Sequence, residues 1–410
     1  MTYLVTGGLG FIGSTFVKYV LEAELNARVI ILDALTYAGN LANVQNLLTG
    51  NNIIYPQRRE ELRNIIVHSN GSGLAQNIDG LREVSTRIEG RLKGYSVIRP
   101  IDSEVSSEIE EVFNGSSYYK SSPSRLAVVI GSVLDSRLVQ SIVPLCNVIV
   151  NFAAETHVDR SIMNPDEFIK TDVYGTYVLL EAARNNANLS RFVDVSTDEV
   201  YGVATEKSFC ETDPINPRNP YSASKAAADR LVYAYNQTYG LPINIVRPSN
   251  NFGPYQYPEK LIPVIITKAL KNEKLPVYGD GRQIRDWLYV GDTVRAIDMV
   301  IHNGQVGEVY NIAGRNEREN IMVIKEILGR LNKPESLISF VQDRPGHDRR
   351  YSLDDSKLRS ELGFESLESF ESNLVKTVDW YLDNQGWWKK ILEEDNEYKK
   401  FMEEWYKDRR

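Results

Sequence analysis

Short apolar runs alternate with longer amphipathic stretches in the first 250 residues. Residues 3–5 form such a run, residues 11–24 repeat apolar positions at helical spacing, and residues 28–32 are apolar again. This order predicts βαβ units and a parallel sheet. Further apolar runs cover residues 126–130, 147–152, 191–196 and 243–246, and further helical windows cover residues 173–184 and 222–239. Because strands this continuously apolar are buried on both faces, we expect a doubly wound parallel α/β sheet.

The alternation of apolar runs and amphipathic stretches is interrupted at residues 51–125, where Gly, Ser and Asn stretches surround moderately amphipathic segments. We interpret this segment as an insertion between elements of the sheet. A peripheral excursion is the simplest interpretation, because each doubling of loop length costs only about 0.6 kcal/mol. An oligomer contact and a cover over the active site are the alternatives.

After Pro248 the sequence gains Pro, Gly and aromatic residues. We therefore expect a sheet domain over residues 1–250 and a smaller α/β domain over residues 251–384. The remaining residues, 385–410, form a C-terminal extension whose apolar side chains recur at helical spacing, which is typical of a packing helix.

Composition and charge narrow the class of protein. With 47 Lys and Arg residues against 55 Asp and Glu residues, the formal charge is −8, so the basic surface of a nucleic-acid binder is missing. No apolar run approaches the ~18 residues of a membrane span, and we expect a cytoplasmic protein without a membrane partner. Cys146 and Cys210 are too few for a disulfide framework and suit a reducing compartment. The four histidines lie far apart in the sequence, so we expect no metal site.

A glycine-rich segment, Thr6-Gly7-Gly8-Leu9-Gly10-Phe11-Ile12-Gly13, follows the first predicted strand and opens the first predicted helix. This is the context of a dinucleotide fingerprint, in which glycines permit a tight turn and the helix start stabilises a pyrophosphate. Asp33 ends the second predicted strand, where a carboxylate accepts a hydrogen bond from a ribose 2′-hydroxyl and repels a 2′-phosphate. The segment therefore predicts NAD rather than NADP. The alternative is that Gly10 and Gly13 only allow close packing of helix and strand.

Three polar side chains, Thr197, Asp198 and Glu199, follow the predicted strand at residues 191–196. Ligands bind at the carboxyl ends of strands in such sheets, so we expect these side chains in a crevice. Adjacent carboxyls in different surroundings can differ enough in pKa for one to act as an acid and the other as a base. The alternative is an acidic pair that complements a helix N-terminus.

Tyr221 and Lys225 begin a helical pattern at a spacing that puts both side chains on one face. An ammonium beside a phenol lowers the pKa of the phenol toward that of a useful base. Among 23 tyrosines one Tyr-x-x-x-Lys match is expected by chance, so the position of this one after Thr197 is what makes it informative.

These motifs resemble the extended short-chain dehydrogenase/reductase superfamily and, within it, the dTDP-glucose 4,6-dehydratase family. The likeness covers nearly the whole chain outside the insertion and the C-terminal extension. Besides the motifs above, it rests on Asp33-Ala34-Leu35-Thr36-Tyr37-Ala38-Gly39-Asn40-Leu41, Phe152-Ala153-Ala154-Glu155-Thr156-His157-Val158-Asp159-Arg160-Ser161, residues 249–263, residues 275–290 and residues 343–351. It implies a Rossmann domain that binds NAD and a second domain that binds a nucleotide-sugar substrate, dTDP-glucose.

The resemblance also implies a reaction that regenerates its cofactor. Tyr221 removes the C4-hydroxyl proton while hydride leaves C4, supported by Thr197 and Lys225. The 4-ketone acidifies the proton at C5, which Glu199 takes while Asp198 protonates the departing C6 hydroxyl, and hydride returns to C6. The enzyme is then a hydro-lyase that makes dTDP-4-dehydro-6-deoxy-glucose for deoxysugar biosynthesis, usually of rhamnose.

Binding residues are carried over from the same resemblance. The cofactor residues are Gly7, Gly10, Phe11, Ile12, Gly13, Asp33, Ala153, Ala154, Tyr221 and Lys225. The substrate residues are Thr156, Arg160, Asn250, Lys260, Leu261, Pro276, Tyr278, Arg285, Asn311, Arg344 and His347. Asn250 and Arg285 are expected at the diphosphate, and residues 260–263 and 276–278 around the base.

The residues alone leave structural alternatives open for several of these side chains. Arg285 could pair with Asp286 and hold two loops together. Asn311 and His347 are of types that often serve as structural hydrogen bonders, and His157 could only orient its loop.

The chain departs from the family pattern at a few positions. Gly131-Ser132-Val133 stands where Gly-Asp-Ile is usual, which weakens or replaces a contact to adenine. Ala34, Thr156 and Phe252 also replace the usual residues, without removing a catalytic group.

Two other functions remain as alternatives. A nucleotide-sugar 4-epimerase or a uronate decarboxylase shares the Tyr, Lys and Thr or Ser but needs no elimination pair. A dinucleotide-sensing regulator without turnover would not need the catalytic groups. The resemblance further implies a homodimer, for which residues 173–180 and 226–235 offer apolar faces.

Overall fold

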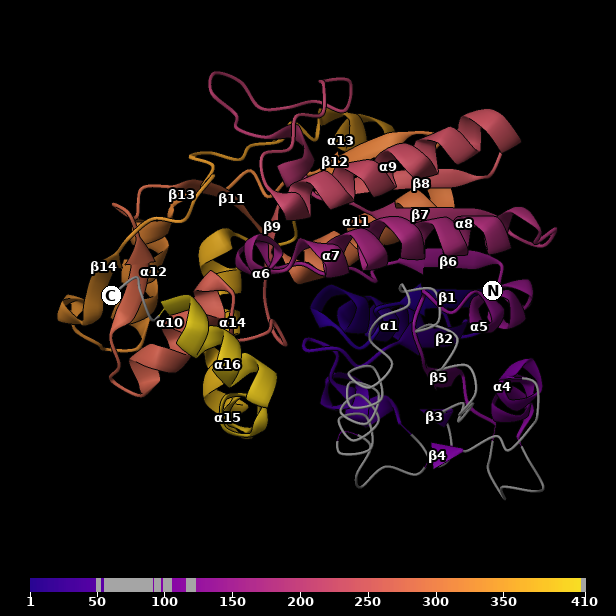
Figure 1. The fold of residues 1–410 in the computed structure, drawn as a ribbon, viewed down its shortest axis with the longest axis horizontal. Coiled ribbons are helices and arrows are strands. Elements are labelled where there is room, and N and C mark those ends of the chain that lie inside the picture. The colour runs from indigo at the N-terminus through magenta and orange to yellow at the C-terminus, as the bar shows by residue number, and fades with distance from the viewer. Residues whose placement is uncertain (49–52, 55–90, 92–96, 99–104, 116–122, 407–410) are drawn as a thin grey trace, which may run out of the picture. The chain divides into compact units, whose positions relative to one another are not determined.

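The computed structural model describes residues 1–48, 53–54, 91, 97–98, 105–115 and 123–406 (Figure 1). The chain divides into two compact units. Unit 1 comprises Met1–Ala153 and Val178–Ser190, and unit 2 comprises Ala154–Tyr177 and Arg191–Arg410.

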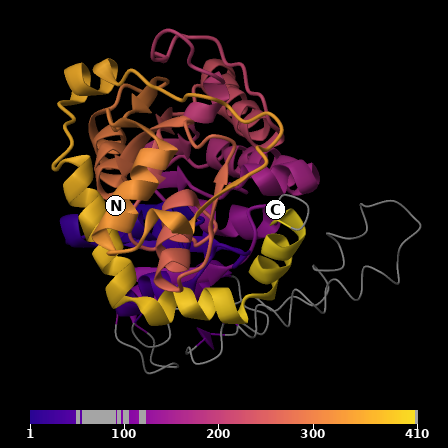
Figure 2. The same cartoon turned by 90° about the vertical axis from the view of Figure 1, so that its left-hand side faces the viewer.

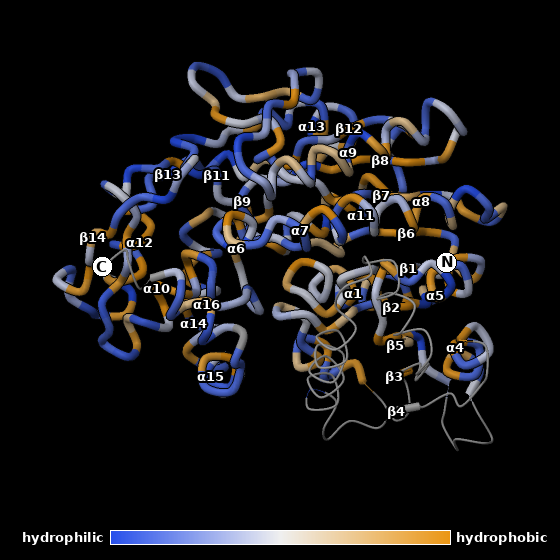
Figure 3. The backbone as a smooth tube through the Cα atoms, in the orientation of Figure 1, coloured by the Kyte–Doolittle hydropathy of each residue, from blue (hydrophilic) through white to orange (hydrophobic). Residues whose placement is uncertain are grey.

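Unit 1 is built on a parallel sheet with the strand order β6-β1-β2-β5-β3-β4. The strands are β1 (Thr2–Thr6), β2 (Arg28–Asp33), β3 (Ile53–Ile54), β4 (Val97–Ile98), β5 (Leu126–Ile130) and β6 (Val148–Asn151). The helical elements are α1 (Phe11–Ala23), η1 (Leu41–Leu47), α4 (Val105–Asn114), α5 (Ser136–Ile142), η2 (Val143–Leu145) and most of α8 (Thr176–Arg184). The central strands β1, β2 and β5 are almost wholly buried and are mainly hydrophobic in Figure 3, as the apolar runs predicted.

Parts of the predicted insertion belong to this sheet. Ile53 and Ile54 pair with Val128 and Val129 of β5, and β4 extends the sheet by one further strand. Helix α4 buries Val105, Ile109, Val112 and Phe113, which recur at helical spacing. Most other residues of the predicted insertion lie outside the described residues. Within the described part, the segment therefore extends the edge of the sheet.

Unit 2 contains three parallel strands in the order β12-β8-β7, a mixed sheet in the order β13-β11-β9 and the parallel pair β10-β14. The strands are β7 (Arg191–Val195), β8 (Ile243–Pro248), β9 (Asn250–Phe252), β10 (Leu275–Tyr278), β11 (Ile284–Tyr289), β12 (Val309–Ile312), β13 (Glu317–Glu319) and β14 (Ile338–Val341). The helices up to residue 303 are α6 (Val158–Met163), α7 (Pro165–Phe168), η3 (Ile169–Gly175), η4 (Asp198–Tyr201), α9 (Pro220–Tyr239), α10 (Leu261–Leu270) and α11 (Val290–Asn303). The later helices are α12 (Asn320–Arg330), η5 (Glu335–Leu337), α13 (Ser356–Leu362), α14 (Phe370–Asp383), α15 (Gln385–Glu394) and α16 (Asn396–Tyr406).

Two helices differ from the sequence-based prediction. The helical window at residues 173–184 begins earlier, as the π-helical segment η3, and continues as α8. The hydroxyl of Thr176 donates to the carbonyl oxygen of Asp172 over 2.6 Å within this segment. The C-terminal extension is not one helix, because Asp395 adopts an extended conformation between α15 and α16. Its carboxylate accepts the N–H of Tyr398 and so begins the second helix.

The C-terminal helices follow one another along the edge of unit 2, shown in yellow in Figure 2. α14 and α15 contribute Phe370, Leu374, Val378, Tyr381 and Trp388 to an apolar core that also contains residues of α10 and α12. Among the described residues, no helix is long and apolar enough to cross a membrane.

Candidate active site

The glycine-rich turn of unit 1 joins β1 to the start of α1. Gly7 has φ +64, and a Cβ there would lie 2.9 Å from the amide nitrogen of Ala153. A Cβ on Gly13 would lie 2.4 Å from the carbonyl oxygen of Gly7. Both glycines are therefore required by close packing. Gly10 is the N-cap of α1 and offers no side-chain hydrogen bond, so the N–H groups of Phe11 and Ile12 at the helix start remain suited to an anion.

Asp33 lies at the end of β2, next to this turn. Its Oδ2 accepts the N–H of Leu9 over 2.9 Å, and its Oδ1 accepts the N–H of Leu35 over 2.8 Å. Burial raises the pKa of Asp33, while these two hydrogen bonds and the charge of Arg91 lower it. Each carboxylate oxygen keeps a second lone pair, so the side chain can still accept from a ribose hydroxyl. The turn and Asp33 together fit an adenine dinucleotide.

The strand β7 of unit 2 delivers Thr197, Asp198 and Glu199 to a short 3₁₀ turn, η4. Thr197 is the N-cap, and its hydroxyl accepts the N–H of Glu199 over 3.3 Å. The cap is thus the threonine, and the two acids need not serve that purpose. The turn ends at Gly202, which has φ +82. A Cβ on this residue would lie 2.5 Å from the carbonyl oxygen of Asn216, so the position requires glycine.

Asp198 is 2% exposed, and its Oδ1 lies 3.1 Å from the hydroxyl of Thr197. Burial and the neighbouring charge of Glu199 raise the pKa of Asp198 well above its usual value, which favours the protonated form of the carboxyl. Its buried Oδ2 has no hydrogen-bond partner among the described residues. A buried carboxyl with a raised pKa is suited to act as a general acid.

Glu199 is less buried and faces Tyr351. The hydroxyl of Tyr351 lies 3.2 Å from Oε2 of Glu199 and 2.7 Å from Oδ2 of Asp348. The guanidinium of Arg285 lies 4.3 Å from the centre of the Tyr351 ring. The two neighbouring acids thus have different surroundings, as an acid and base pair requires.

Tyr221 and Lys225 lie at the start of α9, and both are buried. Burial raises the pKa of Tyr221 well above its usual value, the charges of Glu199 and Asp172 raise it further, and a hydrogen bond with Thr197 lowers it. The net pKa of this phenol is therefore raised in this structure, and stabilisation of its phenolate by Lys225 stays a prediction. The charge of Lys225 lowers the pKa of Asp172, which burial raises. The physical reason for the raised pKa of Tyr221 is desolvation of the phenol together with two nearby carboxyls.

Asp172 links η3 to this helix. Its Oδ1 accepts the N–H of Glu155 over 2.9 Å, and its Oδ2 accepts the hydroxyl of Ser224 over 2.5 Å. Burial, with smaller contributions from charged neighbours, raises the pKa of Asp172 to about 7 and that of Glu155 to about 8. The pair is therefore protonated at mildly acidic pH and titrates near neutrality.

Several predicted substrate residues form a group of cations in unit 2, of which Arg285 is buried and Arg160, Lys260 and Arg344 are partly buried. Lys260 donates to the carbonyl oxygen of Thr156 over 2.6 Å, and burial lowers the pKa of Lys260. Arg160 pairs with Glu259 over 3.0 Å, and Arg344 pairs with Asp159 over 3.0 Å. The Nε of Arg344 is buried without a hydrogen-bond partner among the described residues. The charge of Glu199 raises the pKa of Lys260, of Arg285 and of Arg344, against the effect of burial on each.

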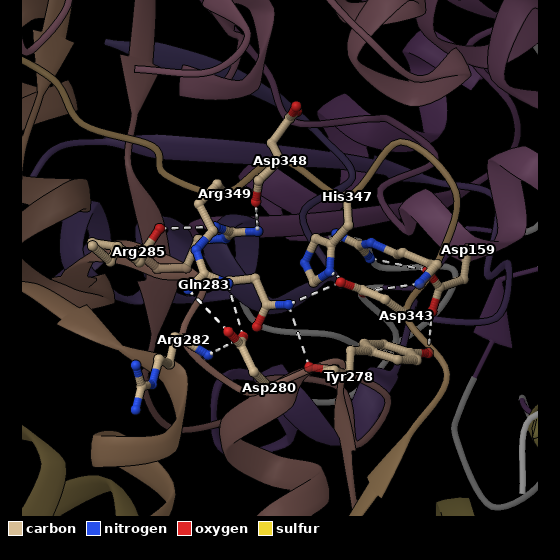
Figure 4. A network of polar contacts seen from close by, with 12 residues as sticks. Asp159, Tyr278, Asp280, Arg282, Gln283, Arg285, Asp343, His347, Asp348 and Arg349 are labelled. Carbon is tan, nitrogen blue, oxygen red and sulfur yellow. Dashed lines mark hydrogen bonds and ion pairs between the residues drawn. The ribbon is translucent and has the colours of Figure 1, made fainter. Parts of the chain in front are cut away.

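Tyr278 and His347 meet in the polar network of Figure 4. The hydroxyl of Tyr278 donates to Oδ2 of Asp159 over 2.9 Å, and Nδ1 of His347 lies 2.5 Å from Oδ1 of Asp343. Burial and nearby arginines lower the pKa of His347 to about 4, against the effect of Asp343. His347 and Tyr278 contact edge to face at 5.9 Å.

Arg285 and Asp286 have separate partners. Arg285 donates to the carbonyl oxygens of Ile284 and Asp348, and Asp286 accepts the N–H groups of Gly314 and Asn316. Neither side chain is held by an ion pair between Arg285 and Asp286, which was the structural alternative.

The remaining predicted residues divide into two groups. Asn250 lies at the start of β9, and its buried Oδ1 has no hydrogen-bond partner within the described residues. Leu261 begins α10, Pro276 lies in β10, and Ala153 and Ala154 follow β6. Asn311 is different, because its amide donates to the carbonyl oxygens of Phe209 and Asp354 and accepts the hydroxyl of Tyr201. Its groups are used inside the protein, which supports the structural alternative for Asn311.

Sequence reasoning missed several residues of this site. Tyr351, Asp348, Asp159 and Glu259 contact predicted site residues, and Asp172 acts on Lys225 and Tyr221 through its charge. Four of them lie inside segments that carry the resemblance, but no spacing rule connects them to their partners. Only an alignment of relatives could have indicated them.

The fold and these side chains define a dinucleotide-dependent enzyme of the extended short-chain dehydrogenase/reductase class. Residues 3–70 match the model of the NAD dependent epimerase/dehydratase family, and residues 91–377 match the GDP-mannose 4,6 dehydratase model. The chain is 43% identical over 411 residues to dTDP-glucose 4,6-dehydratase from Xanthomonas campestris, covering 96% of each chain. It belongs to the dTDP-glucose 4,6-dehydratase family, whose members are NAD-dependent hydro-lyases.

Solved structures agree with this assignment. DesIV, the dTDP-glucose 4,6-dehydratase of Streptomyces venezuelae, was crystallised with NAD. It is 37% identical to this chain, with a TM-score of 0.75, and the match covers 95% of this chain and 100% of DesIV. A UDP-glucuronic acid 4-epimerase from Bacillus cereus has a TM-score of 0.69 at 22% identity, covering 93% of this chain and 99% of that one, which shows the shared fold alone. The predicted fold class, family and NAD dependence are confirmed.

Proposed function

We propose that this chain converts dTDP-glucose to dTDP-4-dehydro-6-deoxy-glucose by oxidation at C4, elimination of water across C5 and C6, and reduction at C6. The observation that carries the proposal is the pair Asp198 and Glu199. Asp198 is buried, its pKa is raised and its Oδ2 has no hydrogen-bond partner among the described residues, whereas Glu199 is less buried and lies beside a phenol. An elimination needs one carboxyl that gives a proton and one that takes a proton, and an epimerase needs neither.

In this proposal Tyr221 takes the proton of the C4 hydroxyl, and Thr197 and Lys225 support it. The neutral phenol found in this structure must lose its proton first, and the hydrogen bond with Thr197 favours that loss. Glu199 then takes the proton at C5, and Asp198 gives its own proton to the departing C6 hydroxyl, which leaves as water. When C6 is reduced, Glu199 returns its proton to C5. The proton that Tyr221 took from the C4 hydroxyl passes to solvent, and Asp198 regains a proton from solvent, so that all three groups return to their initial states.

Residues of the glycine turn, Gly7, Gly10, Phe11, Ile12 and Gly13, would hold the cofactor together with Asp33, Ala153, Ala154, Tyr221 and Lys225. Bound NAD supplies the hydride acceptor for oxidation at C4 and the hydride donor for reduction at C6. The side chain of Ser132 follows β5, and its hydroxyl accepts the N–H of Leu134 over 3.1 Å. A serine engaged in this way is a weaker adenine contact than a carboxylate.

We assign the nucleotide-sugar to the group of cations in unit 2. Arg344, Arg285 and Lys260 match the two charges of a diphosphate, with Arg160, Asn250 and His347 nearby in the same set of predicted residues. Thr156, Leu261, Pro276 and Tyr278 belong to the same set. Most of these residues lie in residues 251–384, the segment that we predict to be the substrate domain.

The test is a direct assay with dTDP-glucose, with UDP-glucose in parallel, following loss of one water by mass and the 4-keto product by its absorbance in alkali. Glu199→Gln and Asp198→Asn are expected to stop water loss. Inversion at C4 without water loss in the unmodified protein would favour the epimerase. Tyr310→Phe is a suitable control, since its phenol bonds Glu361 outside this group of residues.

We further propose a homodimer. The segments η3 and α9 pack together and expose Ile169, Tyr174 and Tyr233, and Tyr177 follows in α8. Exposed aromatic side chains on adjacent helices are typical of protein interfaces. Light scattering is expected to give twice the chain mass, and Tyr177→Glu is expected to give a monomer. An unmodified chain that stays monomeric at micromolar concentration would contradict the proposal.

A cytoplasmic location and a role in rhamnose-type deoxysugar synthesis complete the proposal. The two cysteines, Cys146 and Cys210, are both free thiols, which suits a reducing compartment. Cell fractionation and loss of the deoxysugar from cells that lack the gene test these two points.

A further inference from the structure

The last helix of the described chain, α16, packs its aromatic face on predicted substrate-binding residues. Tyr398, Phe401 and Trp405 are buried and recur at helical spacing. The guanidinium of Arg160 lies 4.3 Å from the centre of the Phe401 ring, and the His157 ring contacts the same ring edge on at 5.2 Å. These contacts join the C-terminal extension to helix α6, which contains Arg160, and to His157, the residue just before that helix.

The second contact is a directed hydrogen bond. The indole N–H of Trp405 donates to the hydroxyl oxygen of Tyr278 over 2.7 Å. An indole can only donate, so the Tyr278 hydroxyl must accept there and direct its own proton to Asp159. Asp159 in turn pairs with Arg344. A chain of polar contacts therefore runs from Trp405 through Tyr278 and Asp159 to Arg344.

The start of α16 is anchored on another part of the same region. The hydroxyl of Tyr257 donates to Oδ2 of Asp395 over 3.0 Å, and the hydroxyl of Tyr398 donates to the carbonyl oxygen of Pro258 over 3.3 Å. Residues 257 and 258 lead directly into Glu259 and Lys260. The helix α16 thus connects the segment around Lys260 with the strand that carries Tyr278.

We propose that Trp405 and Phe401 are positioning residues for the nucleotide part of the substrate, which they serve by holding Tyr278 and Arg160. The inference rests on the proposed function, because that function makes Tyr278 and Arg160 part of a nucleotide-sugar site. Tyr278 is only half-buried, so its ring can contact a ligand while the indole N–H of Trp405 holds its hydroxyl. The aromatic residues of the extension then affect binding of the nucleotide and leave the elimination chemistry unchanged.

The test compares Trp405→Phe with the unmodified NAD-loaded, full-length protein. An aromatic ring is kept, while the indole N–H that donates to Tyr278 is lost together with the pyrrole part of the side chain. KM for dTDP-glucose is expected to rise about three- to tenfold, the change expected for one buried hydrogen bond, with kcat unchanged. Binding of dTDP alone, measured by calorimetry, is expected to weaken by the same factor. Phe401→Leu is a second variant, which removes the aromatic partner of Arg160 and is expected to act in the same direction.

Two controls separate positioning from a general effect on stability. Trp388→Phe makes the same substitution in α15, where the indole donates to the carbonyl oxygen of Tyr381 over 2.9 Å, and is expected to leave KM unchanged. In a Tyr278→Phe background, Trp405→Phe is expected to have no further effect on dTDP binding. Equal weakening in both backgrounds, or a fall in kcat at constant KM, would overturn the inference.

The outcomes also separate this inference from the proposed function. If the unmodified protein binds dTDP but forms no 4-keto product, the proposed function fails, and the effect of Trp405→Phe on dTDP binding still decides the inference. If the product forms but Trp405→Phe binds dTDP as the unmodified protein does, only the inference fails.

Discussion

The hydroxyl of Tyr351 donates toward Oε2 of Glu199 over 3.2 Å, and it also lies 2.7 Å from Oδ2 of Asp348. A phenol has one proton and cannot donate fully to two carboxylates at once. When Glu199 is protonated, it can donate to the phenol oxygen while Tyr351 donates to Asp348. The arrangement therefore accepts Glu199 in both protonation states, which is what a base that gains and loses a proton in each cycle requires.

Tyr351→Phe is expected to lower kcat for water loss about tenfold, since the loss of a hydrogen bond to a charged group costs about 1.5–3 kcal/mol. KM for the substrate is expected to change little. Exchange of the C5 proton with deuterated solvent, measured by mass, is expected to slow in parallel. Tyr310→Phe, which removes a similar phenol to glutamate hydrogen bond, is the matched control. A normal rate of C5 exchange in Tyr351→Phe would contradict the assigned role.

Asp172 predicts a pH dependence of stability. Its pKa of about 7 in the folded protein lies above the ordinary value of 3.8, so the folded state favours its protonated form. This contribution is fully present below about pH 4 and is lost as the pH rises through 7. Asp172→Asn removes the ionisation and keeps partners for Ser224 and the N–H of Glu155. The Tm of the variant minus the Tm of the unmodified protein is expected to be about 2–4 °C larger at pH 8.5 than at pH 5.

Asp280→Asn serves as the control for that experiment. Asp280 is exposed and pairs with Arg349, which lowers its pKa to about 2. Its substitution is expected to leave the difference in Tm the same across that pH range. A difference for Asp172→Asn that does not change with pH would show that the residue is not buried in its protonated form.

Asp33 predicts cofactor selectivity. Asp33→Asn removes the charge that repels a 2′-phosphate and keeps an oxygen that can accept the N–H of Leu9 or Leu35. The ratio of the dissociation constants for NADP and NAD is expected to fall about tenfold, corresponding to about 1.4 kcal/mol. Titration of the cofactor-free protein, followed by protein fluorescence, measures both constants. An unchanged ratio would assign the selection to other residues.

The raised pKa of Tyr221 predicts that the cofactor-free protein keeps this phenol neutral far into the alkaline range. The difference in absorbance at 295 nm between the unmodified protein and Tyr221→Phe is expected to stay flat up to about pH 10, the ordinary value for tyrosine. A step near neutral pH would support the interpretation in which Lys225 stabilises the phenolate. Tyr221→Phe is also expected to abolish oxidation at C4.

Local signals were sufficient for much of the fold and for part of the site. The strands β1, β2 and β5 could be predicted because an apolar run buried on both faces is visible within a few residues. The same holds for Gly13 of the glycine turn, because a Cβ there would meet Gly7 within one βα unit, whereas a Cβ on Gly7 would meet Ala153, which is distant in the sequence. The pair Tyr221 and Lys225 could be predicted from its helical spacing together with its position after Thr197.

The environment of those residues could not be predicted in this way. The sequence alone determined the parallel α/β fold and the dinucleotide turn, because these depend on short-range pattern, whereas the catalytic side chains are predicted from the family resemblance. Only the tertiary structure decided the raised pKa of Tyr221, the contact of Tyr351 with Glu199 across 152 positions, and that of Trp405 with Tyr278 across 127. Desolvation and the direction of a hydrogen bond depend on which distant segments pack together, and this is settled by burial of the whole chain.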